Sequence, residues 1–130
     1  MIYLDSCALV KLAIVEPESA ALLAWLRNGS GAPLLSSSVI RVEVPRSVMR
    51  RQPAAILQAR TLVAKTRRIP VTNEILDTAT MLQPTSLGSL DAIHLASAFS
   101  VAKHLTAFVT YDKRLLDAAS AANLPVVSPN

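Results

Sequence analysis

The chain has 130 residues, so we expect one domain over residues 1–130, and its 52% hydrophobic and 17% charged residues suit a packed core rather than disorder. The one cysteine excludes an intramolecular disulfide, and the sequence has neither a secretory signal pattern nor an apolar run near the ~20 residues of a membrane span. Thirteen basic residues against nine acidic ones give a net charge of +4, which is compatible with a nucleic acid partner, and we expect a cytoplasmic protein without membrane contact.

The predicted elements alternate along the whole chain. The first half has a strand over 1–4, helices over 6–14 and 17–27, a break over 28–31, a strand over 34–35 and helices over 39–51 and 53–67. A brief strand or connector over 68–71 follows, then a helix that Thr72 or Asn73 caps and that reaches 83, and a loop over 84–89. The chain ends with a long helix over 90–105, a strand over 107–110, a helix over 113–122 and a strand over 125–127. Pro17 and Pro53 suit first helical turns, and serines 36–38, Ser89 and Asp112 suit N-caps.

This alternation predicts an α/β fold. Short strands separated by helices require crossover connections, and therefore a mostly parallel sheet of four to five strands with helices on both faces, a three-layer α/β/α arrangement. In such sheets ligands bind beyond the carboxyl ends of the strands, where Asp5 and Asp112 fall.

Four acidic residues could meet in one cleft at that edge. Asp5 and Asp112 follow two of the strands, Asp91 lies in the first turn of the long helix, and Glu43 lies inside the helix over 39–51. Clustered carboxylates repel one another, so they are tolerated only if some are protonated or a cation neutralises them. Oxygen ligands without His or Cys favour Mg²⁺ or Mn²⁺, and such an ion can ionise a bound water and stabilise a phosphoryl group under attack.

The remaining charge fits a phosphodiester substrate. Without the four candidate acids, five acidic residues face thirteen basic ones, so the rest of the surface carries about +8. An acidic, metal-binding pocket within a basic surface is what a nucleic acid substrate requires.

Each acid also has an ordinary structural explanation. Asp91 and Asp112 could cap helices or complement the helix dipole, and Glu43 could pair with Arg46 three residues on. Asp5 is harder to explain in this way, because the end of an apolar strand is poorly placed for solvent. The ordered set of four is therefore more informative than any single member.

The sequence resembles PIN-domain nucleases in four segments. They are Ile2-Tyr3-Leu4-Asp5-Ser6, then Ser37-Ser38-Val39 leading to Glu43 and Arg46, then Leu90-Asp91-Ala92-Ile93-His94-Leu95-Ala96, and Val109-Thr110-Tyr111-Asp112-Lys113-Arg114-Leu115. The size of the chain and the last two motifs are similar to VapC-like toxins of bacterial type II toxin–antitoxin pairs. The resemblance covers nearly the whole chain, in order and with family-like spacing.

The resemblance implies a PIN-like fold and a Mg²⁺- or Mn²⁺-dependent endoribonuclease that inhibits translation. It places Asp5, Glu43, Asp91 and Asp112 at the family's four acidic positions, as catalytic residues and metal ligands. It also implies an RNA substrate, a homodimer and a small antitoxin protein whose tail occupies the cleft.

Two hydroxyl residues also match the family pattern, and two other residues depart from it. Thr110 and Ser6 match family hydroxyls that would orient ligands or water from behind the carboxylates, although both also suit ordinary strand-end and capping roles. Cys7 stands where the family often has Ser or Asn, and we expect a small buried thiol there. Pro45 removes a backbone donor inside a helix, at a cost of ~3 kcal/mol, which leaves the direction of Glu43 open.

Several cations are candidates for binding substrate phosphates. Arg46 and Arg50 share a helical face with Glu43, and Lys113 and Arg114 stand in a first helical turn, where a nearby anion would explain them better than local stability does. His94 lies three residues after Asp91 on one face, and we expect packing or hydrogen bonding rather than direct catalysis.

Other functions remain open from the residues alone. A phosphatase of the haloacid dehalogenase type would use Asp5 as a nucleophile, but it usually has a second aspartate two residues on, where this chain has Cys7. A phosphoacceptor receiver would need paired acids after the first strand. A catalytically silent PIN-fold binding module and a housekeeping PIN nuclease are the remaining alternatives.

Overall fold

The computed structural model describes residues 1–29 and 31–130. Its elements are β1 (Ile2–Leu4), α1 (Ser6–Ala13), α2 (Ser19–Asn28), β2 (Leu34–Ser37), α3 (Ile40–Arg51), η1 (Pro53–Ala55), α4 (Ile56–Lys65), β3 (Arg67–Ile69), α5 (Asn73–Thr80), α6 (Ser89–Phe99), η2 (Ala102–His104), β4 (Ala107–Val109), α7 (Lys113–Ala121) and β5 (Val126–Val127). Of the expected break over 28–31, Ser30 lies outside the described residues.

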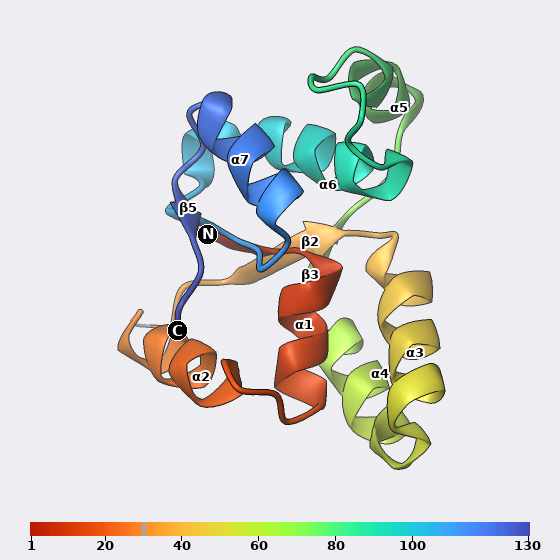
Figure 1. Cartoon of the computed structure of the whole chain (residues 1–130), viewed down its shortest axis with the longest axis vertical. Helices are drawn as coiled ribbons and strands as arrows, with labels where there is room; N and C mark the ends of the chain where they lie inside the picture. The colour runs from red at the N-terminus through yellow and green to blue at the C-terminus, as the bar shows by residue number, and fades with distance from the viewer. Residues whose placement is uncertain (30) are drawn as a thin grey trace.

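The sheet confirms the predicted α/β fold. Its order is β3-β2-β1-β4-β5, and each of the neighbouring pairs is parallel. Helices α1 to α4 lie on one side of the strands and α5 to α7 on the other (Figure 1). Because β1 is central and parallel to both neighbours, the carboxyl ends of β1, β2 and β4 meet at one edge.

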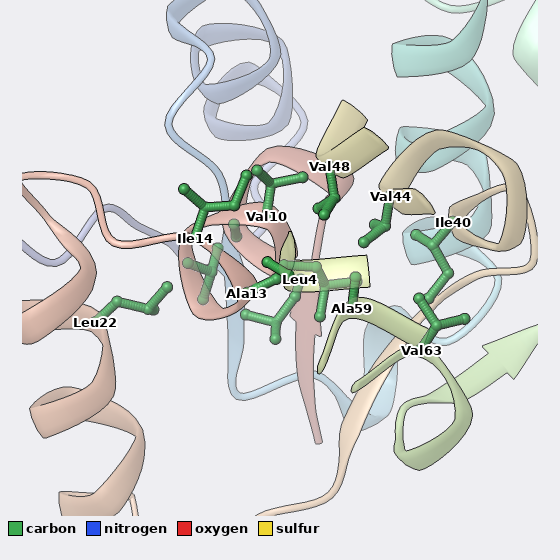
Figure 2. Close-up of a cluster of buried hydrophobic side chains, with 14 of the residues drawn as sticks. Leu4, Val10, Ala13, Ile14, Leu22, Ile40, Val44, Val48, Ala59 and Val63 are labelled. Carbon is green, nitrogen blue, oxygen red and sulfur yellow. The ribbon is translucent and has the colours of Figure 1, made fainter. Parts of the chain in front are cut away.

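Strand β1 builds both halves of the core by alternation. Ile2 and Leu4 pack with α1 to α4, in the cluster that Figure 2 shows around Leu4, Val10 and Val44. Tyr3 points to the opposite face and packs with Phe108 of β4 and with residues of α6 and α7. Because β1 is buried on both faces, packing fixes its position, and this determines where Asp5, the next residue, lies.

Two predicted helix starts were wrong, because serine hydroxyls act elsewhere. Ser36 and Ser37 belong to β2, where the Ser36 hydroxyl donates to the Leu4 carbonyl at 2.6 Å, and Val39 stands at the N-cap of α3 without a side-chain cap. The second helix begins at Ser19 rather than at Pro17, since the Ser19 hydroxyl accepts from the Glu16 amide at 2.9 Å.

The long helix expected over 90–105 is shorter. It includes Ser89, with Gly88 at the N-cap, and ends at Phe99, where the Ser100 hydroxyl donates to the Ser97 carbonyl at 2.6 Å and occupies a carbonyl of the last turn. Residues 67–69 form a strand rather than a connector. None of the helices within residues 1–29 and 31–130 combines the length and apolar character needed to cross a membrane.

Candidate active site

Asp5 stands at the carboxyl end of β1, and its carboxylate is fixed by protein donors. The residue is 3% exposed; its Oδ1 accepts from the Ala8 amide at 2.8 Å and its Oδ2 from the Thr110 hydroxyl at 2.5 Å. The Cys7 thiol donates to both oxygens at 3.1 and 3.2 Å. Burial raises the pKa of Asp5, and the nearby His94 and these hydrogen bonds only partly oppose that rise.

Thr110 connects the ends of β1 and β4. Besides donating to Asp5, its buried hydroxyl accepts from the Asp112 amide at 3.1 Å, so one side chain orients both strand-end aspartates. Ser6 lines the neighbouring cleft, and its hydroxyl makes no side-chain hydrogen bond within the described residues. Of the two predicted hydroxyl residues, Thr110 is therefore buried and hydrogen-bonded to the aspartates, whereas Ser6 faces the cleft.

Asp112 caps α7 and is exposed. Its Oδ1 accepts from the Leu115 amide at 2.9 Å, as the capping alternative predicts. Asp91 makes no such bond, because the N-cap of α6 is Gly88. Burial raises the pKa of Asp91, and the carboxylates of Asp112, Asp5 and Glu43 raise it further. The four predicted acids therefore share one electrostatic neighbourhood, although they come from β1, α3, α6 and the end of β4.

Glu43 meets His94 instead of pairing with Arg46. The Oε2 atom of Glu43 is 2.7 Å from Nε2 of His94, and Nδ1 of the same ring is 2.9 Å from the Tyr3 hydroxyl. Pro45 lies inside α3, which continues from Ile40 to Arg51, and the direction of Glu43 that the sequence left open is toward His94. Buried residues of α3 pack against α1 and α4, and this packing offsets the missing backbone donor.

A divalent cation fits the donor set. Carboxylate oxygens are what Mg²⁺ and Mn²⁺ prefer. Burial is the largest cause of the raised pKa of Asp91, and a cation would relieve the repulsion by nearby carboxylates that raises this pKa further. Burial and the Asp5 charge raise the pKa of Cys7 to about 12, so the thiol keeps the hydrogen with which it donates to Asp5. Among residues 1–29 and 31–130, however, no three His, Cys, Asp or Glu side chains converge closely enough to hold a metal ion as placed.

A cleft of about 580 Å³ opens beside these acids. Its lining includes Glu43 and Asp112 on the acidic side, and Arg46 and Arg50 of α3 as predicted substrate contacts. Acidic and basic groups thus face the same space, which suits a ligand that carries phosphates next to a bound cation.

Lys113 and Arg114 do not line this cleft. The Nζ atom of Lys113 pairs with Asp117 one helical turn on, at 2.9 Å on the exposed face of α7, so an anion of its own helix lies beside it. A contact of Lys113 or Arg114 with substrate phosphate stays a prediction.

Sequence reasoning missed one ionic network along the cleft. Lys11 of α1 binds Glu16 and Glu18 at 2.6 and 2.7 Å and lies 4.7 Å from the Tyr111 ring centroid. Arg51 pairs with Glu16, and so ties the end of α3 to the segment after α1. Arg51 and Glu16 are far apart in the sequence, so no local pattern predicts their ion pair. The position of His94, three residues after Asp91 on one helix, did indicate that its ring lies near the acids.

Comparison with known proteins assigns the family. The model of the PIN domain matches residues 2–121. Ribonuclease VapC47 of Mycobacterium tuberculosis is 42% identical over 132 residues, covering 99% of this chain and 97% of that protein. Ribonuclease VapC46 of the same organism is 41% identical over 129 residues, with 99% and 98% covered.

Solved structures show the same fold at lower identity. Mycobacterium tuberculosis VapC20, described as a sarcin-ricin loop cleaving toxin, superposes with a TM-score of 0.77 at 18% identity, covering 99% of this chain and all of that one. A toxin–antitoxin complex from Klebsiella pneumoniae gives a TM-score of 0.73 at 18% identity, with 100% and 98% covered. From the family match and these relatives, the chain belongs to the PIN domain family and, within it, to the VapC ribonucleases.

Proposed function

We propose that the chain is a Mg²⁺- or Mn²⁺-dependent endoribonuclease that acts as the toxin of a toxin–antitoxin pair and inhibits translation. The observation that carries this proposal is that Asp5, Glu43 and Asp112 lie near enough to Asp91 to raise its pKa beyond the effect of burial, in a chain of the VapC ribonuclease family. The raised pKa of Asp91 supports the cation: burial is its largest cause, and the nearby carboxylates add a repulsion that a bound dication relieves.

The acids have distinct tasks in this proposal. Asp5 and Asp91 are the main ligands, with Glu43 and Asp112 completing the set. When bound, such a cation lowers the pKa of a coordinated water and stabilises charge on the phosphoryl group. Thr110 holds the Asp5 carboxylate in one orientation, and the exposed Asp112 stands where water and substrate reach it.

Basic residues of the cleft bind the RNA backbone. Arg46 and Arg50 line the same space as Glu43 and Asp112, and guanidinium groups can bind phosphate oxygens in pairs. Hydrolysis by an activated water leaves a 5′-phosphate and a 3′-hydroxyl on the two RNA fragments.

The proposed partners are a small antitoxin protein and a second copy of this chain. An antitoxin whose tail occupies the cleft would exclude RNA, and the structural neighbour solved as a toxin–antitoxin complex supports such a partner. The homodimer and the cytoplasmic location stay predictions.

Two alternatives within the family are weaker. A catalytically silent binding module has no need of three further carboxylates that raise the pKa of Asp91, and this chain has all four acids. A housekeeping nuclease shares the chemistry and differs only in its effect on the cell.

The deciding experiment incubates the purified chain with total RNA, with and without Mg²⁺, beside Asp5→Asn and Asp91→Asn. We expect cleavage only with the metal, and a loss of about 10²–10³-fold in each variant, the size typical of removing a group that stabilises transition-state charge. Cleavage by both variants at the wild-type rate would overturn the mechanism. Growth arrest upon expression, relieved by Asp5→Asn, separates a toxin from a housekeeping enzyme.

A further inference from the structure

A buried chain of side chains leads from the core to the candidate site. The Tyr3 hydroxyl is 2.9 Å from Nδ1 of His94, and Nε2 of His94 is 2.7 Å from Oε2 of Glu43. Tyr3 and His94 are 0% and 1% exposed, whereas the Glu43 side chain is 15% exposed and reaches the cleft. The three residues come from β1, α6 and α3, so the bond between His94 and Glu43 joins the two layers of helices, and Tyr3 ties this pair to the central strand.

The ring of His94 is held rigidly. It meets the Tyr3 ring edge-on, with centroids 6.0 Å apart and an interplanar angle of 87°, and Tyr3 in turn stacks on Phe108 at 5.1 Å. Buried rings have few rotamers, unlike an arginine or lysine at the surface. A hydrogen bond from such a ring therefore orients its partner more than a surface ion pair does.

The direction of each hydrogen bond follows from the chemistry of the groups. An ionised carboxylate only accepts, so Nε2 of His94 must carry the hydrogen that binds Glu43. In the neutral imidazole, Nδ1 is then an acceptor, and the Tyr3 hydroxyl is its donor. A tyrosine hydroxyl ordinarily has a pKa of about 10, so Tyr3 carries the hydrogen that it donates at neutral pH.

We infer that His94 is a positioning residue for Glu43, and that Tyr3 fixes the tautomer in which His94 can act. This inference rests on the proposed function, in which Glu43 helps to hold a divalent cation. Glu43 has a long side chain, and within the described residues His94 is its side-chain hydrogen-bond partner. The bond engages Oε2 and so fixes the end of the Glu43 side chain at the wall of the cleft. Groups that orient a metal ligand in this way typically change metal affinity 10–100-fold when removed.

The first test measures Mn²⁺ binding to the whole purified chain by electron paramagnetic resonance, without RNA. His94→Asn is too short to reach Glu43 and should weaken binding about tenfold. His94→Gln places an amide N–H near the position of Nε2 and should restore affinity to within about threefold of wild type. Tyr3→Phe keeps the stacking on Phe108 and should weaken binding about threefold.

His104→Asn is the matched control. His104 is the other histidine of the chain, it is exposed in η2, and its substitution should leave Mn²⁺ affinity unchanged. If His94 had only a structural role, Mn²⁺ affinity would fall equally in His94→Asn and His94→Gln, in proportion to the fall in their unfolding temperatures. That result would overturn the inference. Wild-type affinity in His94→Asn would overturn it as well.

The second test needs no metal. ¹H–¹⁵N correlation spectra of the wild-type histidine rings at pH 8 should show the His94 proton on Nε2, and in Tyr3→Phe the Nδ1 signal should shift. A proton on Nδ1 would contradict the inference. If wild type binds no Mn²⁺, the metal dependence in the proposed function fails, while the tautomer still decides whether Tyr3 and His94 orient Glu43.

Discussion

The carboxyl ends of β1 and β4 carry the same local motif with different surroundings. Asp5 and Asp112 each follow a buried strand and cap the next helix, at 2.8 Å to the Ala8 amide and 2.9 Å to the Leu115 amide. Asp5 is buried and accepts from protein donors at both oxygens, whereas Asp112 is exposed. A carboxylate that caps a helix can therefore also bind a metal ion, because it can accept several hydrogen bonds and a cap uses one of them. Burial determines how many of the others are made to protein donors.

The largest expected effect contrasts these two aspartates directly. In Asp5→Asn, the amide offers one oxygen to the Ala8 and Thr110 donors, so one buried donor loses its acceptor. Asp112→Asn keeps a capping oxygen and directs its amide to solvent. We expect RNA cleavage to fall about 10³-fold in the first variant and about tenfold in the second. Equal losses would mean that the difference in burial has no bearing on catalysis.

The next comparison separates the two hydroxyls beside Asp5. Thr110→Val preserves shape but removes the hydrogen bond to Asp5 and the acceptor of the Asp112 amide, so the cleavage rate should fall about 10–100-fold. The free energy of unfolding, measured by denaturant titration, should fall by about 2 kcal/mol.

Ser6→Ala is the control for Thr110→Val. Ser6 lines the cleft without a side-chain hydrogen bond among the described residues, so we expect less than about a twofold change in rate. A loss in Ser6→Ala as large as that in Thr110→Val would place Ser6 in the machinery that orients Asp5.

Features that depend on neighbouring residues could be predicted from the sequence, whereas contacts between distant residues could not. Strand ends, helix caps and the order of the acids follow from local patterns, so the positions of Asp5 and Asp112 and the parallel sheet were predictable. The bond between Glu43 and His94 joins two helices from opposite faces of the sheet, and no local spacing encodes it. The hydroxyl of Ser36 failed as a cap signal because it binds the carbonyl of Leu4, across the sheet.

A third prediction compares cations near the two strand ends. Arg46 and Arg50 line the cleft, while Lys113 is engaged by Asp117. Reversing both cleft arginines to glutamate should raise the apparent KM for RNA about tenfold and make it less sensitive to salt. Reversing Lys113 and Arg114 should raise KM only about twofold, since screening by solvent weakens exposed charges outside the cleft. An unchanged KM in the second pair would remove α7 from substrate binding.

The smallest expected effect is a dependence of stability on pH at Asp91. Its pKa is raised in the folded chain, by burial first and by Asp112 next, so the folded state binds this proton more tightly than the unfolded state. Below the ordinary aspartate pKa both states are protonated and the full stability is present. As the pH rises through the ordinary and then the raised pKa, the unfolded state ionises first and stability falls. Because Asp91 is only partly buried, the loss should be at most ~1 kcal/mol.

Thermal unfolding of wild type and Asp91→Asn at pH 4 and pH 7.5 measures this difference. The neutral amide resembles the protonated acid, so the two proteins should unfold at similar temperatures at pH 4, and the variant should be the more stable at pH 7.5. Mg²⁺ should narrow the gap at pH 7.5, because a cation that binds only the folded wild type stabilises it. A variant that is less stable than wild type at pH 7.5 without metal would show that Asp91 is stabilised by a partner, and that the acids at this edge do not repel one another.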